Sequence, residues 1–303
     1  MTFPDFYNPS LIGTRYEPDF ARAYQTGLDA YQKPSSDDSP RVLLWLIDAQ
    51  IDFVFADGRL AVSGAVEDTR RTVEFIYRNT PQITHITASL DTHLPSHIFF
   101  AGWWQDANGA HPAPYTVITA EQVARGDWLP TQLPDWSREY VSTLEQIGKK
   151  QLMIWPFHCM EGTTGRALVP ALSEAIQYHS GARHDAPTYL TKGTIPQTEF
   201  YSVVEPEVKV PGRPDGTLNL QFLEFLVEFD LIYIAGQARS HCVLETMRST
   251  LRHFANRPQL VGRLRFLDDC TSSIVGFEES TNAQIAEFVR EGIRLVKAAD
   301  AIG

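Results

Sequence analysis

The feature that most constrains the fold of this chain is an alternation of short apolar runs with longer segments of helical periodicity. The run Val42–Ile47 is continuously apolar and stops at Asp48, as expected for a strand covered on both faces. Similar runs follow at residues 83–90, 187–190, 231–235 and 264–267. Helical spacing of apolar residues occupies residues 66–78, 168–176, 218–228, 243–254 and 281–296. The alternation predicts an α/β protein with a three-layer αβα architecture around a central, mostly parallel sheet.

Two segments depart from this pattern. Residues 1–40 are rich in Pro, Tyr, Ser and Asp, and we expect an extension that lies over the body of the protein or a partly mobile arm. Residues 41–303 are predicted to form the α/β domain, with residues 101–150 as an inserted segment. A segment this long inside a compact domain is usually functional or an inserted subdomain. Its Trp103, Trp104 and His111 could line an acyl pocket or cover the edge of the sheet.

Composition excludes several classes of protein. The 303 residues are 43% apolar, which is ample for a large buried core, and carry a formal charge of −11. No long run of Lys and Arg is present, so an electrostatic footprint for nucleic acid is missing. Cys159, Cys242 and Cys270 are too few and too scattered for a disulfide framework, which fits a reducing cytosol. Neither a signal peptide nor an apolar segment of membrane-spanning length is visible, so we expect a cytoplasmic protein with no membrane partner.

Cys242 stands where an apolar run, residues 231–235, ends in Gly236 and a helical pattern begins. The start of a helix has unpaired N–H groups and the positive end of the helix dipole, which lower the pKa of a thiol and stabilise an oxyanion. These properties favour a nucleophilic cysteine. The alternative is a small buried residue at a strand–helix junction.

Other polar residues follow predicted strands. Asp48 comes directly after Val42–Ile47 and is placed to act as a general base, whereas Asp52 fits a turn or helix cap equally well. Lys192 follows the run at 187–190 and precedes Gly193. A lysine beside a thiol would stabilise its thiolate, although lysines at strand ends are more commonly just solvated.

Asp91, His93 and His97 combine one carboxylate with two imidazoles at spacings of two and four residues. These are suitable ligands for a divalent metal, and zinc, iron and manganese all accept them. His158, in the segment Trp155–Cys159, could complete the group. The alternatives are a hydrogen-bonded turn at residues 91–97 and a proline-kinked aromatic turn at 155–159.

Taken together, these segments resemble the nicotinamidase/isochorismatase-like cysteine hydrolases, and most closely their nicotinamidase (pyrazinamidase) branch. The resemblance spans residues 42–300, interrupted at 101–150. Its motifs stand in the family's order: Asp-x-Gln-x-Asp-Phe (48–53), Asp-x-His-x-x-x-His (91–97), Trp-Pro-x-His-Cys (155–159), Lys-Gly (192–193) and Gly-x-Ala-x-x-His-Cys-Val (236–243).

The resemblance implies the functional residues position by position. The catalytic group is Asp48, Lys192 and Cys242. The backbone N–H groups of Ala238 and Cys242 form the oxyanion hole, next to a cis peptide bond between Gln237 and Ala238. The metal ligands are Asp91, His93, His97 and His158. The aromatic walls of the substrate pocket are Phe53, Trp155 and Tyr201, and Tyr201 aligns only with a small insertion after Lys192.

The expected function is hydrolysis of nicotinamide to nicotinate and ammonia through a Cys242 thioester, in a homo-oligomer that serves NAD salvage. The expected cofactor is a divalent metal ion, zinc before iron or manganese. Three alternatives stay open at this point. One is a related amidase acting on carbamoylsarcosine or ureidoacrylate. The second is a hydrolase that uses metal-activated water, with a cysteine that only packs. The third is a binding protein without catalysis.

Overall fold

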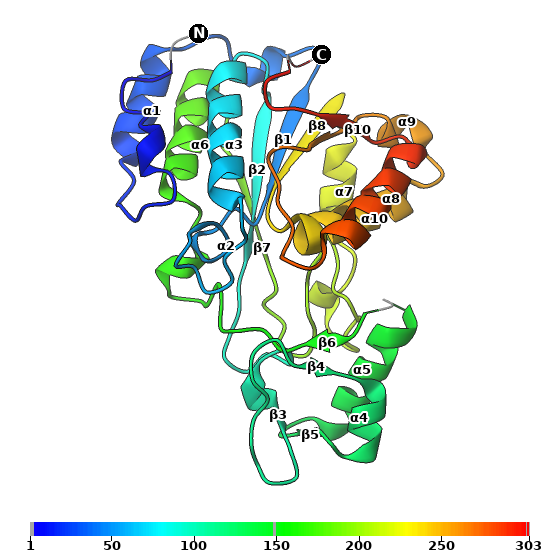
Figure 1. Ribbon diagram of the computed structural model, residues 1–303. Coiled ribbons are helices and arrows are strands. Elements are labelled where there is room, and N and C mark those ends of the chain that lie inside the picture. The colour runs from blue at the N-terminus through cyan, green and yellow to red at the C-terminus, as the bar shows by residue number, and fades with distance from the viewer. Residues whose placement is uncertain (1–2, 148–149, 301, 303) are drawn as a thin grey trace.

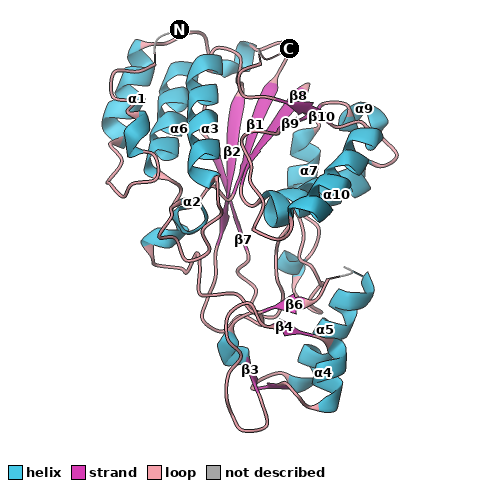
Figure 2. Cartoon of the chain, viewed as in Figure 1, coloured by secondary structure: helices cyan, strands magenta, loops and turns pink. Residues whose placement is uncertain are grey.

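A six-stranded parallel sheet forms the centre of the protein in the computed structural model, which describes residues 3–147, 150–300 and 302. The strands are β1 (Val42–Ile47), β2 (His85–Asp91), β7 (Thr188–Lys192), β8 (Leu231–Gly236), β9 (Leu264–Leu267) and β10 (Arg294–Val296). Their spatial order is β10-β9-β8-β1-β2-β7, and every neighbouring pair is parallel. The sheet twists through the middle of the molecule in Figures 1 and 2.

Helices cover both faces of this sheet. Successive side chains of each strand point to opposite sides, and the apolar ones on both sides are buried against helices. Leu44 and Leu46 of β1 belong to one apolar cluster, while Leu43, Trp45 and Ile47 belong to the other. The first cluster is completed by α3 (Ala65–Asn79) and α6 (Pro170–Arg183). The second is completed by α7 (Leu220–Leu226), α8 (Leu244–Phe254), α9 (Pro258–Val261) and α10 (Glu278–Glu291). The predicted three-layer αβα architecture is therefore confirmed.

The prediction of one continuous helix at residues 281–296 is wrong for the last third of this segment. Helix α10 ends at Glu291, and Gly292 then takes a positive φ of 120°. The chain turns back along the sheet and Arg294–Val296 become the edge strand β10. The apolar residues of this strand continued the helical spacing by coincidence, and the glycine was the only local signal of the break.

The first forty residues contain a helix that the sequence pattern did not reveal, α1 (Phe20–Asp29), which packs along the outer side of α6 (Figure 1). The two helices meet at glycines. A Cβ atom on Gly27 would lie 2.1 Å from the carbonyl oxygen of Tyr178, and one on Gly181 would lie 2.3 Å from that of Tyr24. Backbone therefore approaches backbone, which only glycine permits at these positions.

We expect Gly27→Val to release α1 from α6, because the added side chain would overlap the carbonyl of Tyr178. The free energy of unfolding should fall by about 1–3 kcal/mol, the usual cost of overpacking, and residues 1–40 should become sensitive to limited proteolysis. Ala21→Val, at an exposed position of the same helix, is the matched control. Equal unfolding free energies and equal protease resistance for the two variants would contradict this packing.

Residues 101–147 fold into a small lobe beyond the end of the sheet where the parallel strands terminate (Figure 1). Its elements are β3 (Trp104–Gln105), β4 (Val117–Ile118), α4 (Ala120–Arg125), β5 (Leu129–Pro130) and α5 (Pro134–Ile147), and β6 (Leu152–Met153) closes it by pairing with β4.

Trp103 and Trp104 are fully buried inside this lobe. Trp103 Nε1 donates to Ser137 Oγ at 2.9 Å and Trp104 Nε1 to the carbonyl of Ile98 at 2.7 Å, while His111 Nδ1 lies 2.6 Å from the carbonyl of Trp104. The two tryptophans thus fill the interior of the lobe rather than an acyl pocket. No helix within the described residues has the length and apolar character needed to cross a membrane.

Candidate active site

The carboxyl ends of the central strands bring Asp48, Lys192 and Cys242 together. Lys192 Nζ lies 2.9 Å from Asp48 Oδ2 and donates a hydrogen bond to Cys242 Sγ at 3.6 Å. It also lies 3.0 Å from Asp91 Oδ1 and donates to the carbonyl of Phe200 at 2.6 Å. The three side chains of the expected catalytic group are all buried. A carboxylate, an ammonium and a thiol are therefore in mutual reach, shielded from water.

Local backbone geometry fixes this arrangement. Asp48 follows β1 with a positive φ of 45°, and Ser89 Oγ donates to its Oδ1 at 2.6 Å. Gly236 ends β8 where a Cβ would lie 1.9 Å from the carbonyl oxygen of Ile47, so only glycine fits there. The peptide bond between Gln237 and Ala238 is cis, as expected. The side-chain amide of Gln237 donates to Asp68 Oδ2 at 3.0 Å.

Cys242 does not open an α-helix. It lies in a π-helical turn, Arg239–Val243, and α8 begins two residues later at Leu244. Burial raises the pKa of the Cys242 thiol well above its usual range; Lys192 opposes this shift, and Asp48 and Asp91 reinforce it. The expected lowering of this pKa is therefore absent, because desolvation and two carboxylates outweigh one ammonium. The resting thiol keeps its proton, and a base must remove it.

Asp48 is suited to that task. Burial raises its pKa, Lys192 lowers it and Asp91 raises it again, with a net upward shift. A carboxylate with a raised pKa is a stronger base. Burial lowers the pKa of Lys192, but Asp48 and Asp91 more than compensate and hold it well above its usual range. Lys192 therefore stays charged and balances two buried carboxylates.

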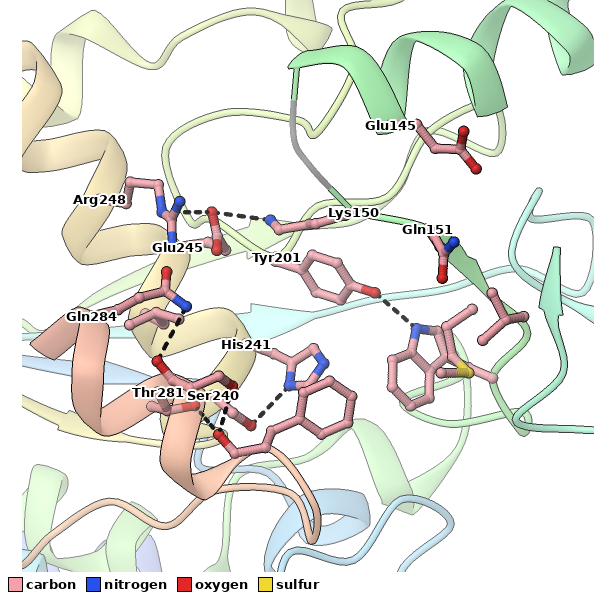
Figure 3. Close-up of a pocket in the computed structure, with 16 residues that line it drawn as sticks. Glu145, Lys150, Gln151, Tyr201, Ser240, His241, Glu245, Arg248, Thr281 and Gln284 are labelled. Atoms are coloured by element: carbon pink, nitrogen blue, oxygen red, sulfur yellow. Dashed lines mark hydrogen bonds and ion pairs between the residues drawn. The ribbon is translucent and has the colours of Figure 1, made fainter. Parts of the chain in front are cut away.

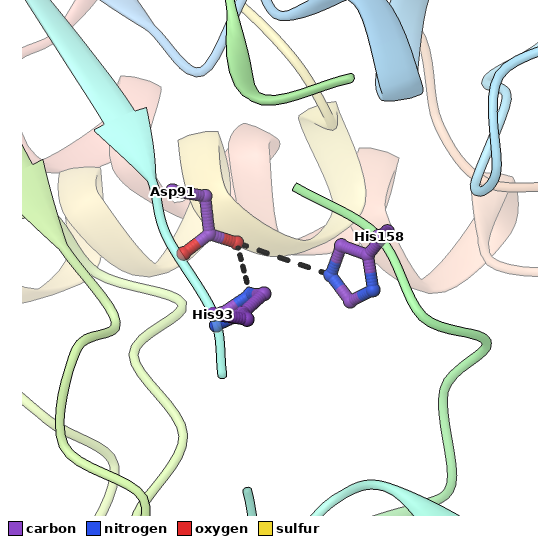
Figure 4. A group of neighbouring side chains, drawn as sticks. All are labelled: Asp91, His93 and His158. Carbon is purple, nitrogen blue, oxygen red and sulfur yellow. Dashed lines mark hydrogen bonds and ion pairs between the residues drawn. The ribbon is translucent and has the colours of Figure 1, made fainter. Parts of the chain in front are cut away.

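Asp91, His93 and His158 form a second group, whose nearest ligand atoms all lie within 4.8 Å of one another (Figure 4). His93 Nε2 is 2.9 Å and His158 Nε2 4.0 Å from Asp91 Oδ2. The other ring nitrogens contact backbone carbonyls, His93 Nδ1 that of Gly193 at 3.2 Å and His158 Nδ1 that of Pro156 at 2.8 Å. Such outer contacts orient the histidines of metal sites and fix their tautomer.

These residues fit a divalent metal ion. Burial, followed by repulsion from His93, lowers the pKa of His158 to about 3, so its imidazole is neutral, the form that binds metals. Burial also lowers the pKa of His93, but Asp91 more than compensates and raises it, so a metal ion would have to displace the proton of His93. Gly193, with a φ of 75°, leaves room beside the group: a Cβ there would lie 2.5 Å from Asp91 Oδ1 and 2.9 Å from His93 Cε1. One carboxylate and two imidazoles suit zinc, iron or manganese and leave coordination positions open for substrate or water.

His97 lies next to this group, with its ring 5.1 Å from that of His93 between centroids, although it is not among the residues whose ligand atoms lie within 4.8 Å of one another. Its ring stacks on Phe99 at 5.0 Å between centroids, and its Nδ1 accepts a hydrogen bond from the Leu94 N–H at 3.0 Å. Its buried Nε2 has no hydrogen-bond partner among the described residues. The structure thus brings together three of the four expected ligands.

A small hollow beside Cys242 joins the two groups. Its lining contains the three expected aromatic residues Phe53, Trp155 and Tyr201, and Trp155 Nε1 donates to Tyr201 Oη at 3.1 Å. The other lining residues are Leu60, Asp91, His158, Glu199, Ala238, His241, Cys242 and Ile274. The hollow measures about 20 Å³, room for about one water. Entry of a six-membered ring therefore requires the lining side chains to move.

Sequence reasoning missed Glu199 and His241 in this lining. His241 precedes Cys242 directly, and its ring makes T-shaped contacts with those of Trp155 at 5.5 Å and Tyr201 at 5.3 Å between centroids. Its position in the motif was a usable signal. Glu199 lies in an irregular loop after β7, where nothing in the pattern marked it. Burial raises the pKa of Glu199 to about 7.

Comparison with solved structures places the chain among nicotinamidases in fold. A nicotinamidase/pyrazinamidase of Acinetobacter baumannii superposes with a TM-score of 0.58 at 18% identity, covering 87% of this chain and 99% of that one. The yeast nicotinamidase bound to the inhibitor nicotinaldehyde gives 0.57 at 23% identity, covering 84% and 99%. The pyrazinamidase of Pyrococcus horikoshii in complex with zinc gives 0.50 at 19% identity, covering 85% and 99%. The chain therefore shares its fold with these solved nicotinamidase and pyrazinamidase structures.

No protein-family model and no curated protein sequence matches the chain. The likeness is one of structure.

Proposed function

We propose that this protein is a cysteine amidohydrolase that converts nicotinamide to nicotinate and ammonia. The observation that carries the proposal is the contact of Lys192 Nζ with both Asp48 Oδ2 and Cys242 Sγ, beside a carboxylate–histidine group and an aromatic-walled hollow. The fold shared with nicotinamidases supports the choice of substrate. The proposed setting is cytoplasmic NAD salvage.

In the first half-reaction, Asp48 takes the proton of the Cys242 thiol as sulfur attacks the carboxamide carbon. The carbonyl electron pair moves to oxygen, where the N–H groups of Ala238 and Cys242 would stabilise it; one such donor contributes about 3 kcal/mol. The C–N bond then breaks, the nitrogen takes the proton from Asp48, and ammonia leaves a thioester. Lys192 keeps its charge throughout and stabilises the thiolate as it forms.

In the second half-reaction, Asp48 takes a proton from water as its oxygen attacks the thioester carbon. The C–S bond breaks, the sulfur recovers the proton from Asp48, and the acid is released. One residue therefore serves as base and acid in turn, which requires a pKa raised toward neutrality, and the net shift of Asp48 has that direction.

Asp91, His93 and His158 would hold the metal ion, whose chemistry when bound is to anchor the ring nitrogen of the substrate. Phe53, Trp155 and Tyr201 would then pack against the ring and point its carboxamide at Cys242. His97 would be the fourth ligand through its Nε2, because its Nδ1 is engaged by a backbone N–H and its buried Nε2 has no hydrogen-bond partner among the described residues.

The test is ammonia release from nicotinamide by purified protein loaded separately with zinc, iron and manganese. We expect turnover with at least one metal, a loss of at least about tenfold on chelation, in line with the cost of disturbing a metal site, and recovery when the metal is restored. No ammonia from any metal-loaded sample would reject nicotinamide as substrate. Turnover that survives full metal removal would reject the role of the ion.

A further inference from the structure

A second, much larger cavity lies next to the hollow at Cys242. It measures about 800 Å³ and shares Trp155, Tyr201 and His241 with the hollow (Figure 3). One wall comes from the lobe at residues 101–147 and from residues 150–153, including Val117 and Gln151. The opposite wall comes from α8 and α10. The three shared aromatic rings thus form the boundary between the thiol and a roomy outer space.

The size of this cavity exceeds what nicotinamide needs. Pockets of about 300–1,000 Å³ typically enclose drug-sized ligands, whereas nicotinamide is a single ring with one amide group. The lobe that forms one wall interrupts the regular alternation of strands and helices. The cavity is therefore formed in part by an inserted segment. Recognition of a larger substrate would depend on the chemistry of the lining.

Three of the four acidic and basic residues of the lining, Lys150, Glu245 and Arg248, are ion-paired, and the fourth, Glu145, accepts a hydrogen bond from the Ala120 N–H at 3.0 Å. Glu245 Oε2 lies 3.0 Å from Lys150 Nζ and 3.4 Å from Arg248 Nε. Lys150 Nζ also lies 2.6 Å from Glu207 Oε2 and 5.0 Å from the centre of the Tyr201 ring. A ligand of strong single charge would have to break these pairs, and a buried charge that loses its partner is costly.

The remaining lining groups are suited to neutral polar atoms. Gln151 offers an amide with donor and acceptor. Gln284 Nε2 donates to the carbonyl of Ser280 at 3.4 Å, which leaves its Oε1 to accept, and Ser280 Oγ donates to the carbonyl of Phe277 at 3.1 Å but can still accept. The rings of Phe277, Tyr201 and His241 provide apolar surface beside them. Amide and hydroxyl groups next to aromatic faces favour a ligand with an uncharged, hydrogen-bonding chain.

We propose that the outer cavity is a substrate subsite that binds a neutral polar extension of the carboxamide hydrolysed at Cys242. This inference rests on the proposed function and refines it from nicotinamide to extended pyridine carboxamides. The extension is attached either to the amide nitrogen, and then leaves as an amine, or to the ring, and then stays on the acid. Both share the same recognition chemistry.

The test compares kcat/KM of metal-loaded protein for three compounds. They are nicotinamide, nicotinamide N-substituted with a carbamoylmethyl chain, and nicotinamide with a hydroxyethylcarbamoyl chain on ring carbon 5. Nicotinate or its substituted analogue is measured by chromatography. The variant is Gln284→Trp, which fills the cavity from α10, and the control is Ala283→Trp at the neighbouring exposed position.

We expect at least one extended compound to match or exceed nicotinamide, and its kcat/KM relative to nicotinamide to fall about tenfold or more in Gln284→Trp but not in Ala283→Trp. Which compound responds identifies the side of the amide that faces the cavity. Turnover of nicotinamide together with poor turnover of both extended compounds, or an equal ratio in both variants, would overturn the subsite and leave the proposed function standing. Turnover of none of the three would overturn both.

Discussion

Cys242→Ala should abolish hydrolysis of nicotinamide, with kcat reduced by about 10⁴-fold or more, as is usual when a covalent nucleophile is removed. The thiol accepts a hydrogen bond from Lys192 Nζ at 3.6 Å. Its replacement leaves Asp48 and the metal group in place but removes the atom that forms the thioester. The measurement is single-turnover nicotinate production by the metal-loaded variant.

Two controls make this result specific. The metal content of Cys242→Ala should equal that of the wild type, because Asp91, His93 and His158 are untouched. Cys270→Ala removes another buried thiol, and it should keep kcat within a few-fold even if its stability falls. Near-normal rates in Cys242→Ala would eliminate the covalent scheme and favour attack by metal-activated water.

Much of this site followed from the order of residues along the chain. Parallel strands end at one edge of a sheet, so Asp48, Asp91 and Lys192, each next to the end of an apolar run, had to meet there. The motif around Gly236 and Cys242 follows a fourth predicted strand, so Cys242 was expected at the same edge. These inferences needed only strand positions, and the structure has these strands within two residues of their expected ends.

The parts that sequence could not provide depend on contacts between distant segments. The pKa of Cys242 was expected to fall, but burial and two carboxylates raise it, and burial is a property of the assembled core. Glu199 lies in an irregular loop that borders the hollow. Its backbone N–H donates to Tyr140 Oη of α5 at 3.2 Å, a contact between segments far apart in the sequence. The packing of helix α1 depends on the contact of Gly27 with α6, which lies about 150 residues further along the chain. No local pattern reveals such a contact.

The second large effect is expected for Lys192→Met, which keeps a long apolar stem but removes the charge between two buried carboxylates. Lys192 Nζ lies within 3.0 Å of both Asp48 and Asp91. Removing one partner of a buried ion pair typically costs about 3–5 kcal/mol, because the remaining charge is left without compensation. The free energy of unfolding of the metal-free protein should fall by that amount in urea denaturation.

The double variant Lys192→Met/Asp48→Asn separates charge balance from general packing. Since it also removes one of the two carboxylates, it should regain part of the lost unfolding free energy, whereas both variants should lack amidase activity. Lys209→Met, at an exposed lysine, should leave the unfolding free energy within about 0.5 kcal/mol of the wild type. A double variant less stable than Lys192→Met alone would show that Lys192 contributes by its packing. A single variant as stable as the wild type would mean that the two carboxylates carry no charge for Lys192 to balance.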